Sequence, residues 1–169
     1  MLSTREVREH VIELLKSYPT MIQKIALLRH EWKNPAQITD SEMLGAMTFA
    51  KGEPGSRPVP GHISDKTYHI AVNYHSQAVY QNKHQIEEIE SELERMEKKV
   101  YRLEYCVSQL PKEQQAVIQG LYFQSIDQKQ LITKLCLSES TIRRYRDKGL
   151  DTLTEMYLTL INAGVVIEW

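Results

Sequence analysis

Hydrophobic residues recur at intervals of three and four along most of the chain, which is the pattern of amphipathic helices. The N-terminal stretch opens with Ser3-Thr4-Arg5-Glu6, which has the form of a capping box, and predicts a helix over residues 4–17. Tyr18-Pro19-Thr20 interrupts the pattern, which then resumes until Asn34-Pro35. The two segments together predict an N-terminal helical hairpin.

The next part of the chain is less regular. Residues 41–50 predict one or two helical turns. Residues 51–62 hold three prolines and three glycines, so neither a regular helix nor a central strand fits there. We therefore expect a Gly/Pro-rich loop over about residues 51–64.

A single long helix is predicted over about residues 65–109, because no proline or glycine occurs between Ser64 and Pro111. Its apolar stripe alternates spacings of three and four, which is a heptad pattern. The stripe consists of Val79, Asn82, Ile86, Ile89, Leu93, Met96, Val100, Leu103, Val107 and Leu110. Two interpretations stay open: an intramolecular bundle covered by the N-terminal helices, or a homodimer through residues 79–110, in which Asn82 fixes the register.

The composition is that of an ordinary globular protein and excludes several classes. Of the 169 residues 41% are hydrophobic and 25% charged, and the formal net charge is −1. No apolar run approaches the roughly 20 residues that span a bilayer, so we expect a cytoplasmic protein with no membrane partner. Two cysteines, Cys106 and Cys136, are too few for a disulfide scaffold, and both are interpreted as packing residues.

From Leu110 onward the pattern predicts three helices. Pro111 suits the first turn of the first, whose apolar face ends near Phe123. Asp127 is a predicted N-cap for a short second helix, and Ser138 for the third, after a tight turn at Cys136-Leu137. Two helices joined by so short a turn, the second carrying arginines, are typical of a helix-turn-helix.

The third helix is locally basic although the chain is not. Residues 139–149 contain four basic and two acidic residues, a local net charge of +2. Because the whole chain has a charge of −1, the remainder has a charge of −3, and any DNA contact is expected at this local patch.

The segment from Leu110 to Leu153 resembles region 4, the promoter-binding module of sigma-70-type factors. The resemblance rests on LPKEQQAVI, LYF, IDQKQLITKL, LSESTIRR and KGLDTL, which follow the family's pattern without a gap. Two positions depart from it: the usual turn glycine is Cys136, and the alanine before the closing leucine is Gly149. These departures predict a less tight turn and a locally looser last helix.

No counterpart of sigma region 2, which melts promoter DNA, is recognised in residues 1–109. The chain instead resembles the ArpU and RinA type of small sigma-like regulators of phages and prophages, which activate late genes. That resemblance implies double-stranded promoter DNA and bacterial RNA polymerase as partners.

By position in region 4, Glu139, Ser140 and Arg144 are expected to read bases, with Arg143 beside them, and Arg146 and Lys148 to lie nearer the DNA backbone. Residues of the preceding helix are expected at phosphates. The complete predicted DNA-binding set is Gln128, Lys129, Lys134, Ser138, Glu139, Ser140, Thr141, Arg143, Arg144, Arg146 and Lys148.

The sequence gives little evidence for a catalytic, metal or cofactor site. The six histidines show no metal-ligand spacing, and no phosphate-binding loop or nucleophile motif occurs, so no enzyme, metal or cofactor is expected. Five tyrosines of the long helix are interpreted as packing residues: Tyr68, Tyr74, Tyr80, Tyr101 and Tyr105.

These observations predict an all-α protein with a helical and coiled-coil region over residues 1–109 and a region 4-like DNA-binding domain over residues 110–169. The predicted function is sequence-specific transcriptional regulation of phage or prophage genes. Two alternatives remain: a DNA-packaging adaptor like a phage small terminase subunit, and a protein-interaction module that does not bind DNA.

Overall fold

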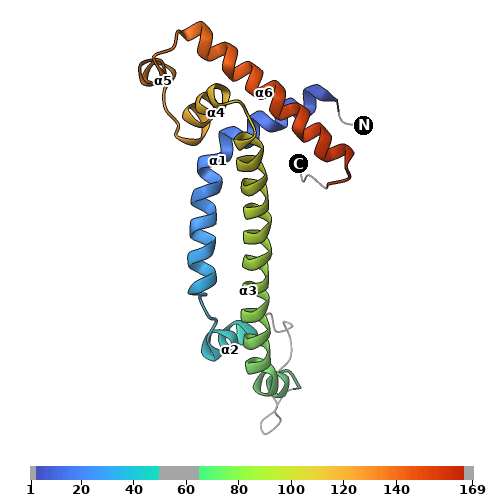
Figure 1. Cartoon of the computed structure of the whole chain (residues 1–169). Coiled ribbons are helices and arrows are strands. Elements are labelled where there is room, and N and C mark those ends of the chain that lie inside the picture. The colour runs from blue at the N-terminus through green and yellow to red at the C-terminus, as the bar shows by residue number, and fades with distance from the viewer. Residues whose placement is uncertain (1–2, 50–64, 166–169) are drawn as a thin grey trace. The chain divides into compact units, whose positions relative to one another are not determined.

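The computed structural model describes residues 3–49 and 65–165, and every regular element in these two ranges is a helix. The prediction of an all-α chain is confirmed for this part of the protein, and the predicted loop at 51–64 lies outside it. Figure 1 shows the elements, which are α1 (Thr4–Lys33), α2 (Asp40–Phe49), α3 (Asp65–Ser108), α4 (Lys112–Ile118), the π-helical turn η1 (Gln119–Phe123), α5 (Gln128–Leu135) and α6 (Glu139–Asn162).

The chain packs as two compact units. The first unit combines residues 1–27 with residues 94–169, and the second comprises residues 28–93. The limits of these units differ from the predicted boundary between residues 109 and 110. The C-terminal turns of α3 belong to the same unit as α6, because Leu103 and Val107 are completely buried there.

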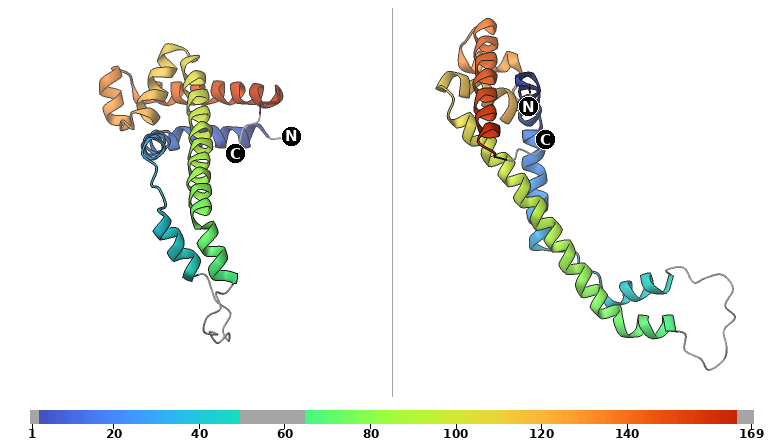
Figure 2. Two further views of the ribbon diagram at one scale, coloured as in Figure 1. Left: turned by 90° about the horizontal axis from the view of Figure 1, so that it is seen from below. Right: turned by 90° about the vertical axis from the view of Figure 1, so that its right-hand side faces the viewer.

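The prediction of an N-terminal hairpin is wrong, because α1 is one continuous helix with Pro19 inside it. The capping box is confirmed: the Ser3 amide donates to Glu6 Oε2 at 2.7 Å, and the Glu6 amide donates to Ser3 Oγ at 3.2 Å. Proline lacks one amide donor and crowds the preceding turn, which bends a helix but need not reverse the chain. Figure 2 shows α1 bent part-way along its length. Buried residues on both sides of the proline, such as Leu15 and Met21, keep the helix continuous.

The second unit contains a short helix that the pattern at 41–50 predicted. A reciprocal capping box begins α2: Thr39 N donates to Glu42 Oε2 at 2.9 Å, and Glu42 N donates to Thr39 Oγ1 at 3.3 Å. Asn82 holds the segment before this helix, since its amide accepts from Ile38 N at 2.7 Å and donates to Ile38 O at 3.1 Å. Asn82, the polar position of the heptad stripe, therefore satisfies the backbone hydrogen-bonding groups of Ile38.

The long helix is confirmed as α3, and the two ends of its heptad stripe differ in burial. The C-terminal part is buried inside the first unit, namely Met96, Val100, Leu103, Val107 and Leu110, whereas Val79 is 54% exposed. The intramolecular interpretation holds for this C-terminal part. A homodimer through all of residues 79–110 requires this packing to open.

Four of the five tyrosines interpreted as packing residues are in fact exposed. Tyr68, Tyr80 and Tyr105 are more than half exposed, and Tyr101 is 73% exposed. They lie outside the heptad stripe, on faces of α3 where the side chains stay exposed. Helical spacing alone does not reveal which faces of so long a helix find a partner.

The C-terminal helices share a small core. Val117 from α4, Leu131 from α5 and Ile142 from α6 are buried against one another, with partly buried residues around them, among them Leu121, Ile126, Ile132, Leu135, Leu137 and Tyr145. Gly149 lies under α4, because a Cβ there would stand 3.1 Å from Ile118 Cγ1. The predicted local loosening at Gly149 is wrong: α6 is uninterrupted there, and the absent side chain allows close packing.

Candidate nucleic-acid interface

Each of the two helices α5 and α6 begins with a side-chain cap, as the sequence predicts. Asp127 Oδ2 accepts from Lys129 N at 3.1 Å, and Ser138 Oγ accepts from Thr141 N at 3.2 Å. Each cap satisfies an amide that the first helical turn leaves without an intrahelical partner. The two starts are therefore fixed by local chemistry as well as by the shared core.

Three residues connect α5 to α6, and the first of them has a left-handed backbone. Cys136 has φ 53° and ψ 37°, and its amide bonds to Ile132 O. The Leu137 amide also points back to Ile132 O, at 3.3 Å. This is the position at which the resemblance expects glycine, and the turn forms with cysteine in its place. The interpretation of Cys136 as a packing residue is wrong, because its side chain is exposed, whereas Cys106 is buried as predicted.

One exposed polar line on the first turns of α6 consists of Ser140, Arg144 and Lys148. These residues are four apart, so they share one face of the helix, and all three are exposed. The Arg144 guanidinium lies 5.5 Å from the centre of the Tyr145 ring. Among the described residues neither Arg144 nor Lys148 forms an ion pair, so both charges face solvent.

The other two arginines are paired with the two acidic residues of the same stretch. Arg143 donates to Glu139 Oε1 at 2.6 Å, and Arg146 donates to Asp147 Oδ1 at 2.8 Å. The Arg146 side chain is 35% exposed. Burial raises the pKa of Tyr122 in η1, and the nearby charge of Arg146 opposes that rise. The four basic residues predicted on the outer face are thus not equivalent, and Arg146 lies toward η1.

The remaining predicted residues lie around the turn and along α5. Lys129 and Lys134 are exposed, and Lys134 Nζ donates to Gln124 Oε1 at 3.0 Å. Gln128 is half-buried, and its Nε2 atom has no hydrogen-bond partner in the described part of the chain. The Thr141 hydroxyl lies 2.8 Å from Ser138 Oγ, so it supports the cap.

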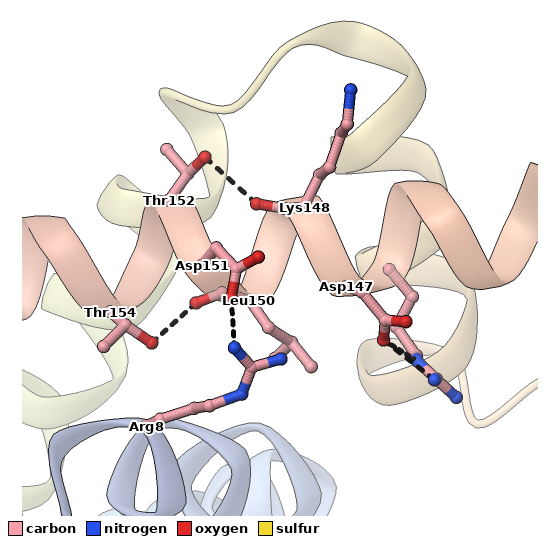
Figure 3. A network of polar contacts seen from close by, with 8 residues as sticks. Arg8, Asp147, Lys148, Leu150, Asp151, Thr152 and Thr154 are labelled. Carbon is pink, nitrogen blue, oxygen red and sulfur yellow. Dashed lines mark hydrogen bonds and ion pairs between the residues drawn. The ribbon is translucent and has the colours of Figure 1, made fainter. Parts of the chain in front are cut away.

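Figure 3 shows the polar contacts around the middle of α6, of which one joins α6 to another helix. Arg8 of α1 bonds to Asp151. The Thr152 hydroxyl donates to Lys148 O at 3.0 Å, and the Thr154 hydroxyl donates to Leu150 O at 2.7 Å. Sequence reasoning missed Arg8, because no local pattern indicates a contact between residues 143 positions apart.

Two further findings concern other kinds of site. Within residues 3–49 and 65–165, no group of three or more His, Cys, Asp or Glu side chains is arranged to hold a metal ion. None of the described helices combines the length and the apolar character needed to cross a membrane.

Comparisons with protein-family models, with curated proteins and with solved structures each found no match. The functional argument therefore rests on the residues themselves.

Proposed function

We propose that this protein is a sequence-specific DNA-binding transcriptional regulator that inserts the first turns of α6 into the major groove of promoter DNA. The observation that carries the proposal is the exposed line of Ser140, Arg144 and Lys148 on a capped helix, three residues after α5 ends. The resemblance to region 4 gives the fuller hypothesis: a sigma-like activator of phage or prophage genes that acts with host RNA polymerase in the bacterial cytoplasm.

The chemistry of this face suits the edges of base pairs. A guanidinium can donate two hydrogen bonds to guanine O6 and N7, and a hydroxyl can donate to or accept from any base. Arg144 has the exposure and the lack of a carboxylate partner that such a contact needs, whereas Arg143 must leave Glu139 first. We therefore assign base reading mainly to Arg144 and expect Lys148 to contact phosphate.

The ion pairs within residues 139–149 predict a modest affinity for DNA. Two of the four cations of residues 139–149 are neutralised by Glu139 and Asp147, which reduces the electrostatic attraction for phosphates. A regulator of this kind needs a second attachment, to polymerase or to another DNA-bound copy, to raise its effective concentration at a promoter.

Selection from a random duplex library tests the proposal, because such a library contains every short target sequence. The wild-type protein is expected to enrich one motif that contains a G·C pair. Arg144→Ala should weaken binding to that motif by about 1–3 kcal/mol, which is roughly 5- to 150-fold, and relax the preference at one base pair.

Arg5→Ala is the matched control. Like Arg144, Arg5 is an exposed arginine in the first turns of a helix, but it lies on α1, outside the candidate interface. The control should enrich the same motif as the wild type. Failure of the folded wild type to enrich any motif would contradict the proposal and favour a protein-interaction module.

A further inference from the structure

An open groove of about 850 Å³ lies between the C-terminal turns of α3 and the last turns of α6. Both stretches belong to the first compact unit, and the two helices cross there (Figures 1 and 2). On the α3 side the groove is lined by Tyr101 and Tyr105, which are four residues apart and share one helix face. On the α6 side Met156 and Leu160 have the same spacing. The groove therefore has an aromatic wall and a second apolar wall.

The lining of this groove carries positive charge without a compensating carboxylate. None of the described residues that line it is an aspartate or a glutamate. Lys98 is paired with Glu94 at 2.7 Å, so its charge is neutralised. Arg102 is half-buried and forms no ion pair with any described residue. Burial raises the pKa of the Cys106 thiol, which therefore adds no negative charge at neutral pH. One uncompensated guanidinium remains in an otherwise apolar groove.

The size and the chemistry of the groove favour a small molecule over a protein partner. Nine described residues line it, whereas a stable protein–protein interface takes about 20–30 residues a side. Its volume is within the range of about 300–1,000 Å³ that is typical of small-molecule sites, which are mainly apolar with a few polar groups. Tyrosine rings and the Met156 thioether both make favourable contacts with aromatic rings.

We propose that this groove binds a small aromatic anion, with the ring system between the Tyr101–Tyr105 wall and Met156 and the acidic group at Arg102. A guanidinium donates hydrogen bonds in a planar fork that matches the oxygens of a carboxylate, sulfonate or phosphate. The apolar walls exclude water from the ring system and so strengthen the ion pair. The site lies at the other end of α6 from the candidate interface and does not depend on DNA binding.

Two fluorescent probes with the same rings test the proposal on the full-length protein. Anilinonaphthalene sulfonate carries one anionic group, whereas phenylnaphthylamine carries none. One molecule of the sulfonate should bind per chain with a Kd on the order of 10–100 µM, which ordinary ligand efficiency gives a ligand of about 21 non-hydrogen atoms. Absence of sulfonate binding to the folded protein would overturn the proposal.

Arg102→Gln isolates the contact with the anion. It should weaken binding of the sulfonate about tenfold, at the lower end of the range for a hydrogen bond to a charged group, because Arg102 is only half-buried. Affinity for the neutral probe should stay the same. Arg5→Gln, at an exposed position of α1, is the matched control and should change neither affinity. Equal loss for both probes, or no loss for either, would overturn the proposal.

A pair of tyrosine variants locates the ring system. Tyr101→Ala/Tyr105→Ala removes exposed side chains and should weaken both probes by about tenfold or more. Tyr68→Ala/Tyr80→Ala removes equally exposed tyrosines from other turns of the same helix and should leave both affinities unchanged. Sulfonate binding that survives the first substitution would place the ligand elsewhere and overturn the proposal.

A second copy of the chain is the rival occupant of the groove. The apparent Kd of the sulfonate should be the same at low and at high protein concentration. A Kd that rises with protein concentration, with dimers in sedimentation that Tyr101→Ala/Tyr105→Ala abolishes, would assign the groove to a second copy and overturn the proposal.

Discussion

Cys136 bears the clearest local strain in the candidate interface. A left-handed backbone costs a side-chain-bearing residue roughly 1–2 kcal/mol, and glycine adopts it freely. The exposed thiol makes one weak hydrogen bond, to Thr133 O at 3.6 Å, so its loss costs little. Cys136→Gly should therefore raise the free energy of unfolding by about 0.5–1 kcal/mol, measured by urea denaturation.

Cys136→Ser controls for loss of the thiol. It keeps a Cβ in the same backbone conformation and should match the wild-type denaturation midpoint. A glycine variant no more stable than the serine variant would contradict the view that backbone conformation, rather than the side chain, sets the energy of this turn.

Gly149 has no side chain, which allows α6 to pack closely against α4. A Cβ at this position would lie 3.1 Å from Ile118 Cγ1, whereas a Cβ at Gly45 in α2 would meet nothing within 4 Å. Gly149→Leu should lower the free energy of unfolding by about 1–3 kcal/mol through overpacking. Gly45→Leu should leave stability equal or higher, because leucine is the better helix former. Thermal melting by circular dichroism compares the two, and equal destabilisation would contradict the packing argument.

At the scale of elements, Tyr18 joins three parts of the first unit. Its hydroxyl donates to Glu104 Oε1 of α3 at 2.6 Å, and its ring stacks on Phe123 of η1 with centroids 3.7 Å apart. Burial, with the hydrogen bond to Glu104 and its charge, raises the pKa of Tyr18 to about 12. The fold therefore favours the neutral phenol.

This shift predicts a loss of stability at alkaline pH. Unfolded tyrosine ionises near pH 10, so above that pH the unfolded state binds fewer protons than the native state, and stability falls until the native pKa near 12 is passed. Burial also raises the pKa of Tyr157, which adds to the fall. Tyr18→Phe keeps the stack and should reduce the slope of unfolding free energy against pH between 10 and 12. An unchanged slope would show that Tyr18 does not contribute.

The helices whose ends are set by local caps and helix-breaking residues were predictable from the sequence. The caps at Ser3, Asp127 and Ser138 and the absence of Gly and Pro from the long helix placed the helix starts and α3 correctly. The break predicted at Pro19 is wrong because the sequence gives the local cost of proline but not the burial of Leu15 and Met21 on either side. Tertiary packing, which outweighs that cost, has no local pattern.

The candidate interface was predictable only in part. Exposure of Arg144 and Lys148 follows from helical spacing, and it agrees with the prediction. The pairing of Arg143 with Glu139 was accessible from their i,i+4 spacing, but the half-buried position of Arg146 depends on where η1 packs. The sequence therefore identified the patch but not which of its cations are available.

On the scale of the whole molecule, the contacts that organise the first unit join distant parts of the sequence. Arg8 bonds to Asp151, and the C-terminal turns of α3 and the last turns of α6 together line an open groove. Such juxtapositions follow from the packing of helices and not from any periodicity. They also explain why the compact units do not coincide with the predicted domains: the C-terminal helices pack with the first residues of the chain.

Genome-wide occupancy in bacterial cells tests most directly the proposal that α6 binds promoter DNA. Wild type, Arg144→Ala and the matched control Arg5→Ala are compared at equal expression. We predict that wild type and Arg5→Ala occupy the same few promoters and that Arg144→Ala loses them by tenfold or more, the factor that about 1.4 kcal/mol gives. Absence of promoter enrichment for the folded wild type, or equal occupancy by Arg144→Ala, would contradict promoter binding through α6.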